Sequence, residues 1–347
     1  MTERVLSTRE LNRALLARQL LLERSPLPMT TVIERIGGLQ TQYAPSGYIG
    51  LWTRMREFHR EQLTRALERR RVIQGWLMRV TIHMVSTPDY RLLAAGIGPG
   101  RRELAGKRPE LRGVDMDEVA RRIRHHLADG PRRAADLQGE LMAEGYPRVA
   151  AVMAGLWVDL VRVPPSGTWE RRRADLHELA DRWLGPSDVT EEQGLEHVVR
   201  RYLGGFGPAS VKDLAGWAGL PVSVVRPVVD RLSLRRFRGE DGSELIDLRG
   251  APLPDPDTPA PVRFIPTWDA TLLVHQRRTQ ILPEDYRDLV FNVKTPHSLS
   301  TFLVDGAVAG SWRYEGGRVQ VEPFAPLPRT VRRQLEAEAD RLAAFHA

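Results

Sequence analysis

The sequence GPRRAADL at Gly130–Leu137 recurs as GPASVKDL at Gly207–Leu214, which defines a shared pattern Gly-Pro-x-x-x-x-Asp-Leu. Each copy follows an amphipathic helix, expected at 117–128 and at 192–204, because apolar residues recur there at helical spacing. Each copy is followed by a short helix, a turn and a second helix, expected at 148–160 and at 222–232, and then by strand-like residues around a polar turn. Helix, helix–turn–helix and β-hairpin in this order are typical of a winged helix, so the repeat predicts two of them.

The residues before the repeat show the same order of elements more loosely. A capping box, Ser7 with Glu10, opens a helix over 7–24, and a second one, Thr31 with Glu34, opens a short helix that glycines end. An irregular stretch, LQTQYAPSGYIGLWTR at 39–54, leads to a helix over 60–71. Residues 76–86 alternate as a strand or one arm of a hairpin. We therefore expect a third, N-terminal winged helix.

The residues after the repeat have a different character. Proline fills five positions between 252 and 261, which is typical of a linker or long loop. Strand-like residues follow, with hairpin turn signals at Asp305-Gly306 and Gly316-Gly317, and a last amphipathic helix is expected over 328–345. The predicted fold class is α+β, three tandem winged-helix modules and a C-terminal β-rich, small barrel-like domain. The expected module boundaries are 1–115, 116–190, 191–250 and, for the C-terminal domain, 263–347.

Composition excludes several classes of protein. The 347 residues include no cysteine, which rules out disulfides, thiolate nucleophiles and cysteine-bound metals. No apolar run is long enough to cross a membrane, and the N-terminus has no signal-peptide core, so we expect a cytoplasmic protein. The histidines show no metal-binding spacing, since His125 and His126 are adjacent and point apart on a helix. Phosphate-loop and nucleophile-elbow motifs are missing too, and we expect no metal and no cofactor.

Positive charge is concentrated in the first third of the chain. The whole chain has 51 Lys and Arg against 44 Asp and Glu, and residues 1–110 alone hold 19 cations and 10 anions. A polyanion bound by that third is the simplest interpretation, with a merely solvated basic surface as the alternative. On charge alone we expect phosphate contacts from Arg54, Arg69, Arg70 and Arg71.

Two groups of polar residues in this basic third are candidates for chemistry. Gln40 and Gln42 face one side if the backbone is extended, and two amides can hold and orient a water molecule. The alternative is a pair of surface amides in a loop. On the predicted strand 76–86, Arg79, Thr81 and His83 alternate and share a face, from which we expect them to contact the bound polyanion. The alternative for that face is the solvent side of a wing.

Four separated blocks resemble one known family. LSTRELNRALLARQ (6–19), GGLQTQYAPSGYIGLWTR (37–54), MRVTIHMVSTPDY (78–90) and TFLVDGAVAGSWR (301–313) occur in the order found in the AlkZ/AlkX-type winged-helix DNA glycosylases. The resemblance implies tandem winged helices with a C-terminal β-rich domain. It also implies excision of N7-alkylguanine-type bases, and unhooking of interstrand crosslinks in the AlkZ branch.

The family's catalytic Gln-x-Gln or Gln-x-Asp motif falls by resemblance on Gln40 and Gln42. Its middle residue is usually aliphatic, whereas this chain has Thr41. The Gln-x-Gln form is closer to the crosslink-unhooking branch. An N7-alkylated guanine is already cationic and leaves without a general acid, so the enzyme must place a water molecule and stabilise the sugar cation.

The resulting hypothesis is a monofunctional DNA glycosylase without lyase activity that acts on cationic alkylated purines in duplex DNA, as a monomer. The competing hypotheses are a non-catalytic winged-helix regulator and, more weakly, a scaffold that binds no DNA.

Overall fold

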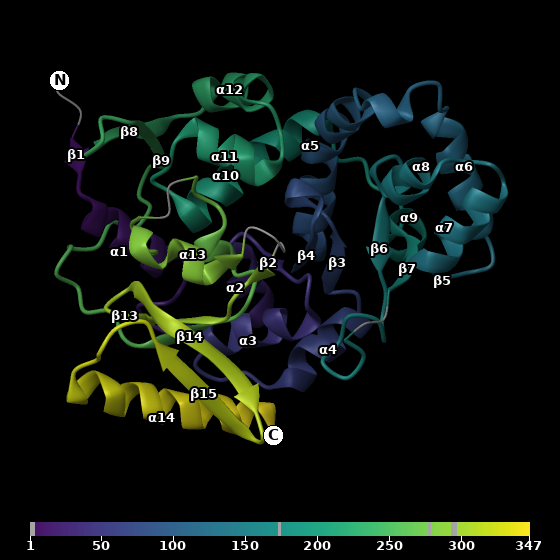
Figure 1. The fold of residues 1–347 in the computed structure, drawn as a ribbon. Coiled ribbons are helices and arrows are strands. Elements are labelled where there is room, and N and C mark those ends of the chain that lie inside the picture. The colour runs from purple at the N-terminus through teal and green to yellow at the C-terminus, as the bar shows by residue number, and fades with distance from the viewer. Residues whose placement is uncertain (1–3, 173–174, 277–278, 293–296) are drawn as a thin grey trace.

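The computed structural model describes residues 4–172, 175–276, 279–292 and 297–347. The chain forms a mixed α and β structure in which the region of the first repeat copy, with α6 to α9, projects as a lobe beside the rest (Figure 1). None of the described helices has the length and apolar character that a membrane span requires.

The first copy of the repeat builds this lobe. Its helices pack around a small core that includes Val119, Leu137 and Leu141, all nearly inaccessible to solvent. The helix expected over 148–160 is shorter, because a 3₁₀ turn follows at Ala154–Leu156 and a strand begins at Leu160. The elements are α6 (Met116–His126), β5 (Arg132–Arg133), α7 (Ala134–Ala143), α8 (Arg148–Met153), β6 (Leu160–Arg162), β7 (Leu176–Leu179) and α9 (Ala180–Leu184).

The second copy follows the expected order closely. Thr190 and Gln193 form a capping box at the start of its first helix, and Ser210 caps the next one. The hairpin is joined by an extra parallel strand from the N-terminus, where Leu6 pairs with Gly239. The elements are α10 (Glu191–Phe206), α11 (Val211–Ala218), α12 (Val222–Arg231), β8 (Leu234–Gly239), β9 (Glu244–Leu248) and the added β1 (Val5–Leu6).

The N-terminal region departs from expectation in three places. The second helix begins at Met29 after Pro28, so the Thr31–Glu34 capping box is wrong. The stretch 39–54 is largely helical rather than irregular, since α3 covers most of it. The elements are α1 (Thr8–Arg18), α2 (Met29–Arg35), β2 (Leu39–Gln40), α3 (Ala44–Arg54), α4 (Arg60–Glu68), β3 (Val72–Trp76), η1 (Met78–Val80), β4 (Ile82–Ser86), α5 (Thr87–Gly106) and η2 (Pro109–Leu111).

The third departure concerns residues 76–86, which are not one strand. β3 ends at Trp76, a 3₁₀ turn follows, and β4 starts at Ile82, so the segment is the end of one arm, the turn and the other arm of a hairpin. Arg79 lies in that turn with a left-handed φ of 53°. The expectation that Arg79, Thr81 and His83 alternate along one strand face is therefore wrong.

One six-stranded sheet connects the first two predicted modules. Its order is β2-β4-β3-β6-β7-β5, with β3 antiparallel to β6 across the boundary at 115. Packing between α5 and α10 joins the first and third modules in turn. A Cβ added at Gly96 would lie 2.3 Å from the carbonyl carbon of Gly194, so only glycine permits this approach of the two helices. The first module therefore shares a sheet with the second and packs helix against helix with the third.

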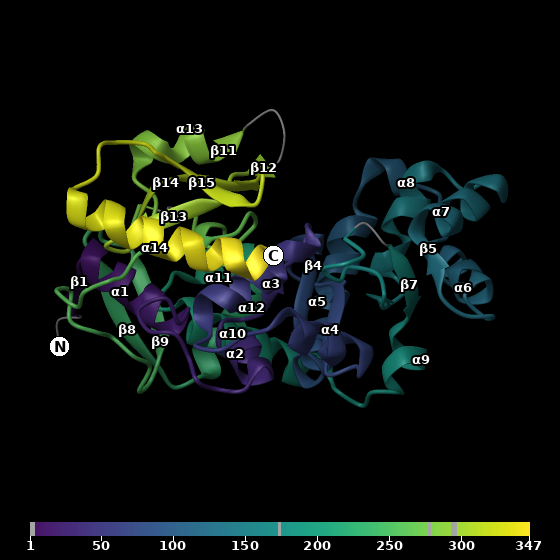
Figure 2. The ribbon, with the colours of Figure 1, turned by 90° about the horizontal axis from the view of Figure 1, so that it is seen from below.

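The C-terminal region is an open sheet, and the expected barrel is wrong. Its order is β10-β13-β14-β15, with β10 and β15 as the two edges, and the turns at Asp305-Gly306 and Gly316-Gly317 are confirmed. The last helix lies along this sheet (Figure 2). The elements are β10 (Arg263–Ile265), η4 (Ala270–Leu272), η5 (Glu284–Tyr286), α13 (Arg287–Val290), β11 (Phe291–Asn292), β12 (His297–Ser298), β13 (Thr301–Val304), β14 (Ala307–Glu315), β15 (Arg318–Pro323) and α14 (Arg329–His346).

Candidate active site

The two glutamines lie at the edge of the six-stranded sheet. Gln40 pairs with His83 of β4, and the backbone N–H of Thr41 continues the ladder by donating to the carbonyl of Ile82 at 2.8 Å. Leu39 and Thr41 face α3, because Cβ atoms added at Gly50 and Gly47 would lie 2.9 Å from their side chains. Gln40, between them, therefore faces the opposite side, and Gln42 follows in a bend.

Thr41 takes the place of the usual aliphatic residue in this arrangement. Its side chain is fully buried, with its methyl group toward Gly47, and its Oγ1 has no hydrogen-bond partner within the described part of the chain. Thr41 therefore acts as an apolar residue in packing, although it buries an unsatisfied hydroxyl.

Both glutamine side chains are held through their carbonyl oxygens. Arg79 donates from Nη2 to Oε1 of Gln40 at 2.6 Å, and the backbone N–H of Ile82 donates to Oε1 of Gln42 at 3.0 Å. Gln40 is 5 % exposed, whereas Gln42 is exposed. Among the residues that the structure describes, neither Nε2 has a protein partner, so the two NH₂ groups remain as donors for a ligand.

Arg79 links the glutamine pair to the third module. Its Nη1 is 3.4 Å from the carbonyl oxygen of Trp217 at the end of α11. Gly219, which follows that helix, packs directly on the Arg79 backbone, since an added Cβ would lie 3.1 Å from the Arg79 nitrogen. The site is thus assembled from β2, the β3–β4 turn and the α11–α12 turn.

His83 lies beside Gln40 but inside the protein. It is 1 % exposed, and its Nδ1 is 2.9 Å from the carbonyl oxygen of Thr81. Burial, together with the positive charge of Arg79, lowers the pKa of His83 to about 3, so the ring is neutral at physiological pH. Thr81 donates its hydroxyl to the carbonyl of Met78. These placements do not fit the expected DNA contact by His83.

Arg54 does not lie on the surface either. Its guanidinium is 1 % exposed and binds both carboxylate oxygens of Asp269, at 2.8 and 2.9 Å. Thr271 and Gln19 accept further hydrogen bonds from it. The phosphate contact expected for Arg54 is wrong, because an arginine so engaged supports the core between α3 and the C-terminal region.

Arg69, Arg70 and Arg71 are exposed but distant from the glutamines along the sheet. They precede Val72, which pairs with Ser86, whereas Gln40 is level with Gly75 and His83. Three residues of strand separate the two positions, or about 10 Å. Arg70 also lies over the Trp183 ring at 4.1 Å and binds its carbonyl oxygen.

The charge excess of the first third is smaller in the folded protein than in the sequence. Among the described residues, five of its arginines form ion pairs with carboxylates from residues beyond 240, and three of these guanidinium groups are almost completely buried. The pairs are Arg9–Asp305, Arg13–Asp305, Arg18–Asp247, Arg24–Glu338 and Arg54–Asp269. The surplus counted along the sequence therefore includes cations that hold the modules together.

One residue near the glutamines was missed by sequence reasoning. Arg172, from the connection between β6 and β7, donates from Nη1 to the hydroxyl of Tyr43 at 3.1 Å, directly after Gln42. A cluster of arginines in the predicted wing was the available signal, but the neutral total charge of that module obscured it.

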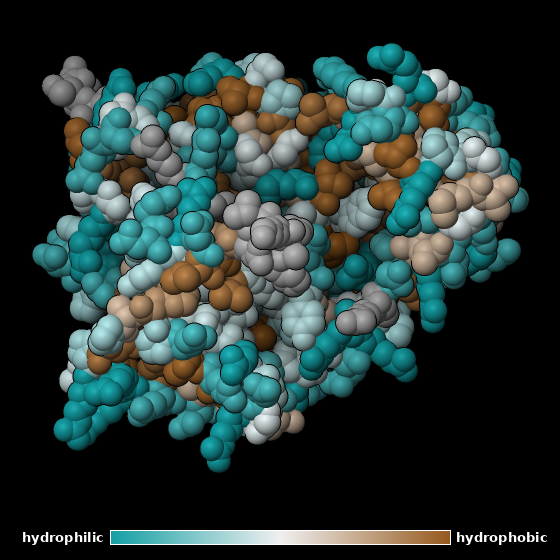
Figure 3. All heavy atoms as spheres, in the orientation of Figure 1, coloured by the Kyte–Doolittle hydropathy of each residue, from teal (hydrophilic) through white to brown (hydrophobic). Residues whose placement is uncertain are grey.

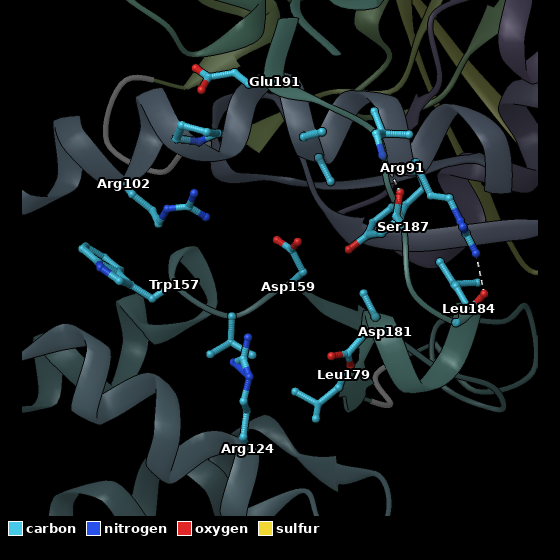
Figure 4. Close-up of a pocket in the computed structure, with 18 residues that line it drawn as sticks. Arg91, Arg102, Arg124, Trp157, Asp159, Leu179, Asp181, Leu184, Ser187 and Glu191 are labelled. Carbon is cyan, nitrogen blue, oxygen red and sulfur yellow. Dashed lines mark hydrogen bonds between the residues drawn. The ribbon is translucent and has the colours of Figure 1, made fainter. Parts of the chain in front are cut away.

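A cavity of about 450 Å³ lies elsewhere, between α5 and the second module (Figure 4). Its lining mixes Arg91, Arg102 and Arg124 with Asp159, Asp181 and Glu191, and it includes neither glutamine. No group of three or more potential metal ligands occurs within the described ranges.

The fold and the amide pair at its sheet edge can be set beside known proteins. The model of the DNA glycosylase AlkZ-like family matches residues 33–345, and the chain belongs to this family of enzymes. A relative from Streptomyces sahachiroi, described as an interstrand DNA cross-link repair glycosylase, is 24 % identical over 94 % of this chain and 93 % of its own. The solved structure of DNA glycosylase AlkZ from the same organism superimposes with a TM-score of 0.79, at 19 % identity, over 99 % of this chain and 97 % of that one.

Proposed function

We propose that this DNA glycosylase hydrolyses the N-glycosidic bond of cationic alkylated purines of the N7-alkylguanine type, including those joined in interstrand crosslinks. The observation that carries the proposal is that Arg79 and Ile82 of the β3–β4 hairpin anchor the two glutamines, with each Oε1 bound to the protein and each Nε2 left for a ligand. The Streptomyces relative is described as an interstrand cross-link repair glycosylase, which supports a crosslinked substrate.

The division of labour follows from the chemistry of the substrate. An N7-alkylated guanine carries a positive charge and departs as a neutral base, so no general acid is required. One NH₂ group donates to the oxygen of the attacking water and holds it against C1′, which leaves the second lone pair of that oxygen free to form the new bond. As the water adds to C1′ and the base departs with the electrons of the N-glycosidic bond, the proton that the water loses passes to solvent. The second lone pair of each Oε1 accepts a hydrogen bond from that water or faces the developing sugar cation.

Arg79 supports this arrangement instead of acting on the base. A guanidinium bound to Oε1 polarises the Gln40 amide and makes its NH₂ group a better donor. The cation itself is unfavourable beside a positively charged sugar and favourable beside a phosphate. We therefore assign Arg79 to positioning Gln40 and to contact with the DNA backbone.

The remaining proposals concern the partner and the architecture. The substrate is duplex DNA bound by a monomer, with Arg69 and Arg71 as phosphate contacts at the far end of β3. The helical units and hairpins are three tandem winged-helix modules over 1–115, 116–190 and 191–250, which present an open groove to the duplex. An open groove suits a crosslinked base pair, which cannot be flipped into a closed pocket.

Strand cleavage after alkali treatment tests the proposed function. The protein is incubated with duplexes containing N7-methylguanine or a nitrogen-mustard crosslink, and abasic sites are revealed as breaks. We expect breaks on both substrates only after alkali, and loss of most of them in Gln40→Ala and Gln42→Ala. Gln320→Ala, an exposed amide on β15, is the matched control. Duplex binding without breaks on either substrate would instead support a non-catalytic DNA-binding protein.

A further inference from the structure

The connection between β6 and β7 leaves its own module and is anchored on the first one. Trp169, in the middle of this connection, is 5 % exposed and packs edge-on against Tyr48 of α3, with ring centroids 5.6 Å apart. Phe345 of α14 contacts the other side at 5.5 Å. The loop beside α4 in Figure 1 is therefore held by buried aromatic contacts, and its tip at 165–171 combines buried residues with the exposed Glu170 and Arg171.

Hydrogen bonds fix the conformation of this tip. Gln74 of β3 donates to the carbonyl of Gly167 at 3.0 Å, and the N–H of Gly167 donates to the carbonyl of Arg171. The N–H of Arg171 in turn donates to the hydroxyl of Thr168. Gly167 has a φ of +71°, and an added Cβ would lie 2.4 Å from Oε1 of Gln74, so glycine is required there. The tip presents the residues that follow in a defined position.

Those residues belong to a group of three exposed arginines, which we call the wing arginines: Arg133, Arg171 and Arg172. They line one cavity of about 470 Å³ together with Pro165, Ser166, Asp175 and Leu176. Asp175 is the single carboxylate in the lining, and none of the wing arginines forms an ion pair within the described residues. Hydrophilic side chains surround the loop in the space-filling view (Figure 3).

One of the wing arginines contacts the residue that follows the glutamine pair. Arg172 lies over the Trp169 ring at 5.3 Å, and its Nη1 reaches the hydroxyl of Tyr43. Tyr43 is next to Gln42 in the chain, and 41 % of it is exposed. Through Arg172 and Tyr43, the wing arginines are connected to the Gln40–Gln42 site.

We propose that the wing arginines bind consecutive phosphates of the DNA strand that leaves the Gln40–Gln42 site. Guanidinium groups bind phosphate oxygens bidentately, and three of them around one concave surface fit a sugar–phosphate backbone. The location at the exit of the site rests on the proposed function. The phosphate binding itself does not, since it requires only the charge, the exposure and the fixed loop.

Salt dependence of binding to an undamaged duplex tests this proposal. Binding is measured by fluorescence anisotropy between about 50 and about 200 mM KCl, for wild type and for Arg133→Ala/Arg171→Ala/Arg172→Ala. The logarithm of affinity falls with the logarithm of salt by about 0.9 for each phosphate neutralised. We expect the magnitude of this slope to be smaller by about 2 to 3 in the triple variant, and its affinity to be lower for every DNA sequence.

A second triple variant controls for total charge. Arg329, Arg332 and Arg333 on α14 are also exposed and form no ion pair within the described residues, so their replacement by alanine removes the same charge elsewhere. We expect that slope to stay within about 0.5 of wild type. An unchanged slope in the wing variant, or equal losses in the two triple variants, would overturn the proposal.

Two further measurements keep the test decisive. Arg172→Lys retains the charge and is expected to keep the slope, and thermal melting shows whether each variant is folded. If the triple variant melts early, the single variants Arg133→Glu and Arg171→Glu replace it, each with an expected slope loss of about 1. The two proposals can fail separately, because binding is measured on undamaged duplex. If the wild-type protein is inactive in the cleavage assay but the triple variant has a changed salt slope, only the proposed function is contradicted.

Discussion

Gln40 and Arg79 are 2.6 Å apart between Oε1 and Nη2, and the two residues come from different elements, the edge strand β2 and the left-handed turn between β3 and β4. The turn is itself packed against the residues that follow α11. The orientation of the Gln40 amide therefore depends on contacts across two predicted modules.

Arg79→Ala is expected to reduce excision much more than binding. Without the guanidinium the Gln40 amide is free to rotate, and a displacement of about 1 Å at a reacting group costs about 100-fold in rate. The single-turnover rate at saturating enzyme should fall by that order, with the affinity for undamaged duplex changed only a few-fold. A large loss of affinity with a normal rate would mean that Arg79 serves the DNA backbone alone.

Gly219→Ala tests the same link from the other module. Gly219 has a φ of +73°, and its new methyl group would press on the Arg79 backbone. We expect a reduced single-turnover rate with both glutamines intact. Gly242→Ala, at a similar φ of +78° in the β8–β9 turn with open space around it, is the matched control.

His83 should make the folded protein less stable in acid. Its pKa is about 3 when folded, against 6.5 for the unperturbed side chain, so between these values only the unfolded chain takes up the proton. The stability contribution is complete above pH 6.5 and declines as the pH falls toward 3. At pH 5 the loss amounts to about 2 kcal/mol.

Urea unfolding at pH 5 and pH 8 measures this effect. The difference in unfolding free energy between the two pH values should be smaller in His83→Asn, which keeps a donor near the position of Nδ1. His125→Asn, at an exposed histidine of α6, should behave like wild type. An unchanged pH dependence in His83→Asn would show that the ring is not buried as described.

Arg54→Ala is expected to lower stability and not to alter DNA binding by the folded fraction. Removing one partner of a buried ion pair leaves Asp269 uncompensated and costs about 3 to 5 kcal/mol of unfolding free energy. The double variant Arg54→Met/Asp269→Leu should recover most of this loss. If a stable Arg54→Ala protein instead shows a weaker dependence of DNA affinity on salt, Arg54 contacts a phosphate, as charge alone predicts.

Two helical glycines have opposite expected effects on stability, because only one of them lies where α5 and α10 approach closely. Gly194→Ala forces a Cβ to within 2.3 Å of the Gly96 nitrogen, so it should destabilise the protein by about 1 to 3 kcal/mol or more. Gly139→Ala on α7, where nothing lies within 4 Å, should stabilise it by about 0.5 to 1 kcal/mol. Chemical denaturation of both variants provides the measurement, and equal effects would contradict the helix contact.

Local patterns in the sequence were sufficient for much of the fold. The Gly-Pro repeat, the Ser7–Glu10 capping box and the Asp305-Gly306 turn are interactions within a few residues, so they could be predicted without tertiary information. The shared side of Gln40 and Gln42 stays a prediction, because Gln42 lies in a bend after the strand. The stretch 39–54 misled the prediction because its glycines favour an irregular backbone, whereas they let α3 approach β2 closely.

The sequence by itself determined the repeated helical units, the glutamine pair and the absence of cysteine chemistry, because each depends on residue identity and short spacing. Tertiary structure alone decided which arginines are available to DNA. Arg54 pairs with Asp269, more than 200 residues away, while Arg172 reaches Tyr43 from another module. Whether an arginine is available to DNA depends on whether a carboxylate lies beside it in the folded chain. A count of charges along the sequence does not give the distance between two such groups.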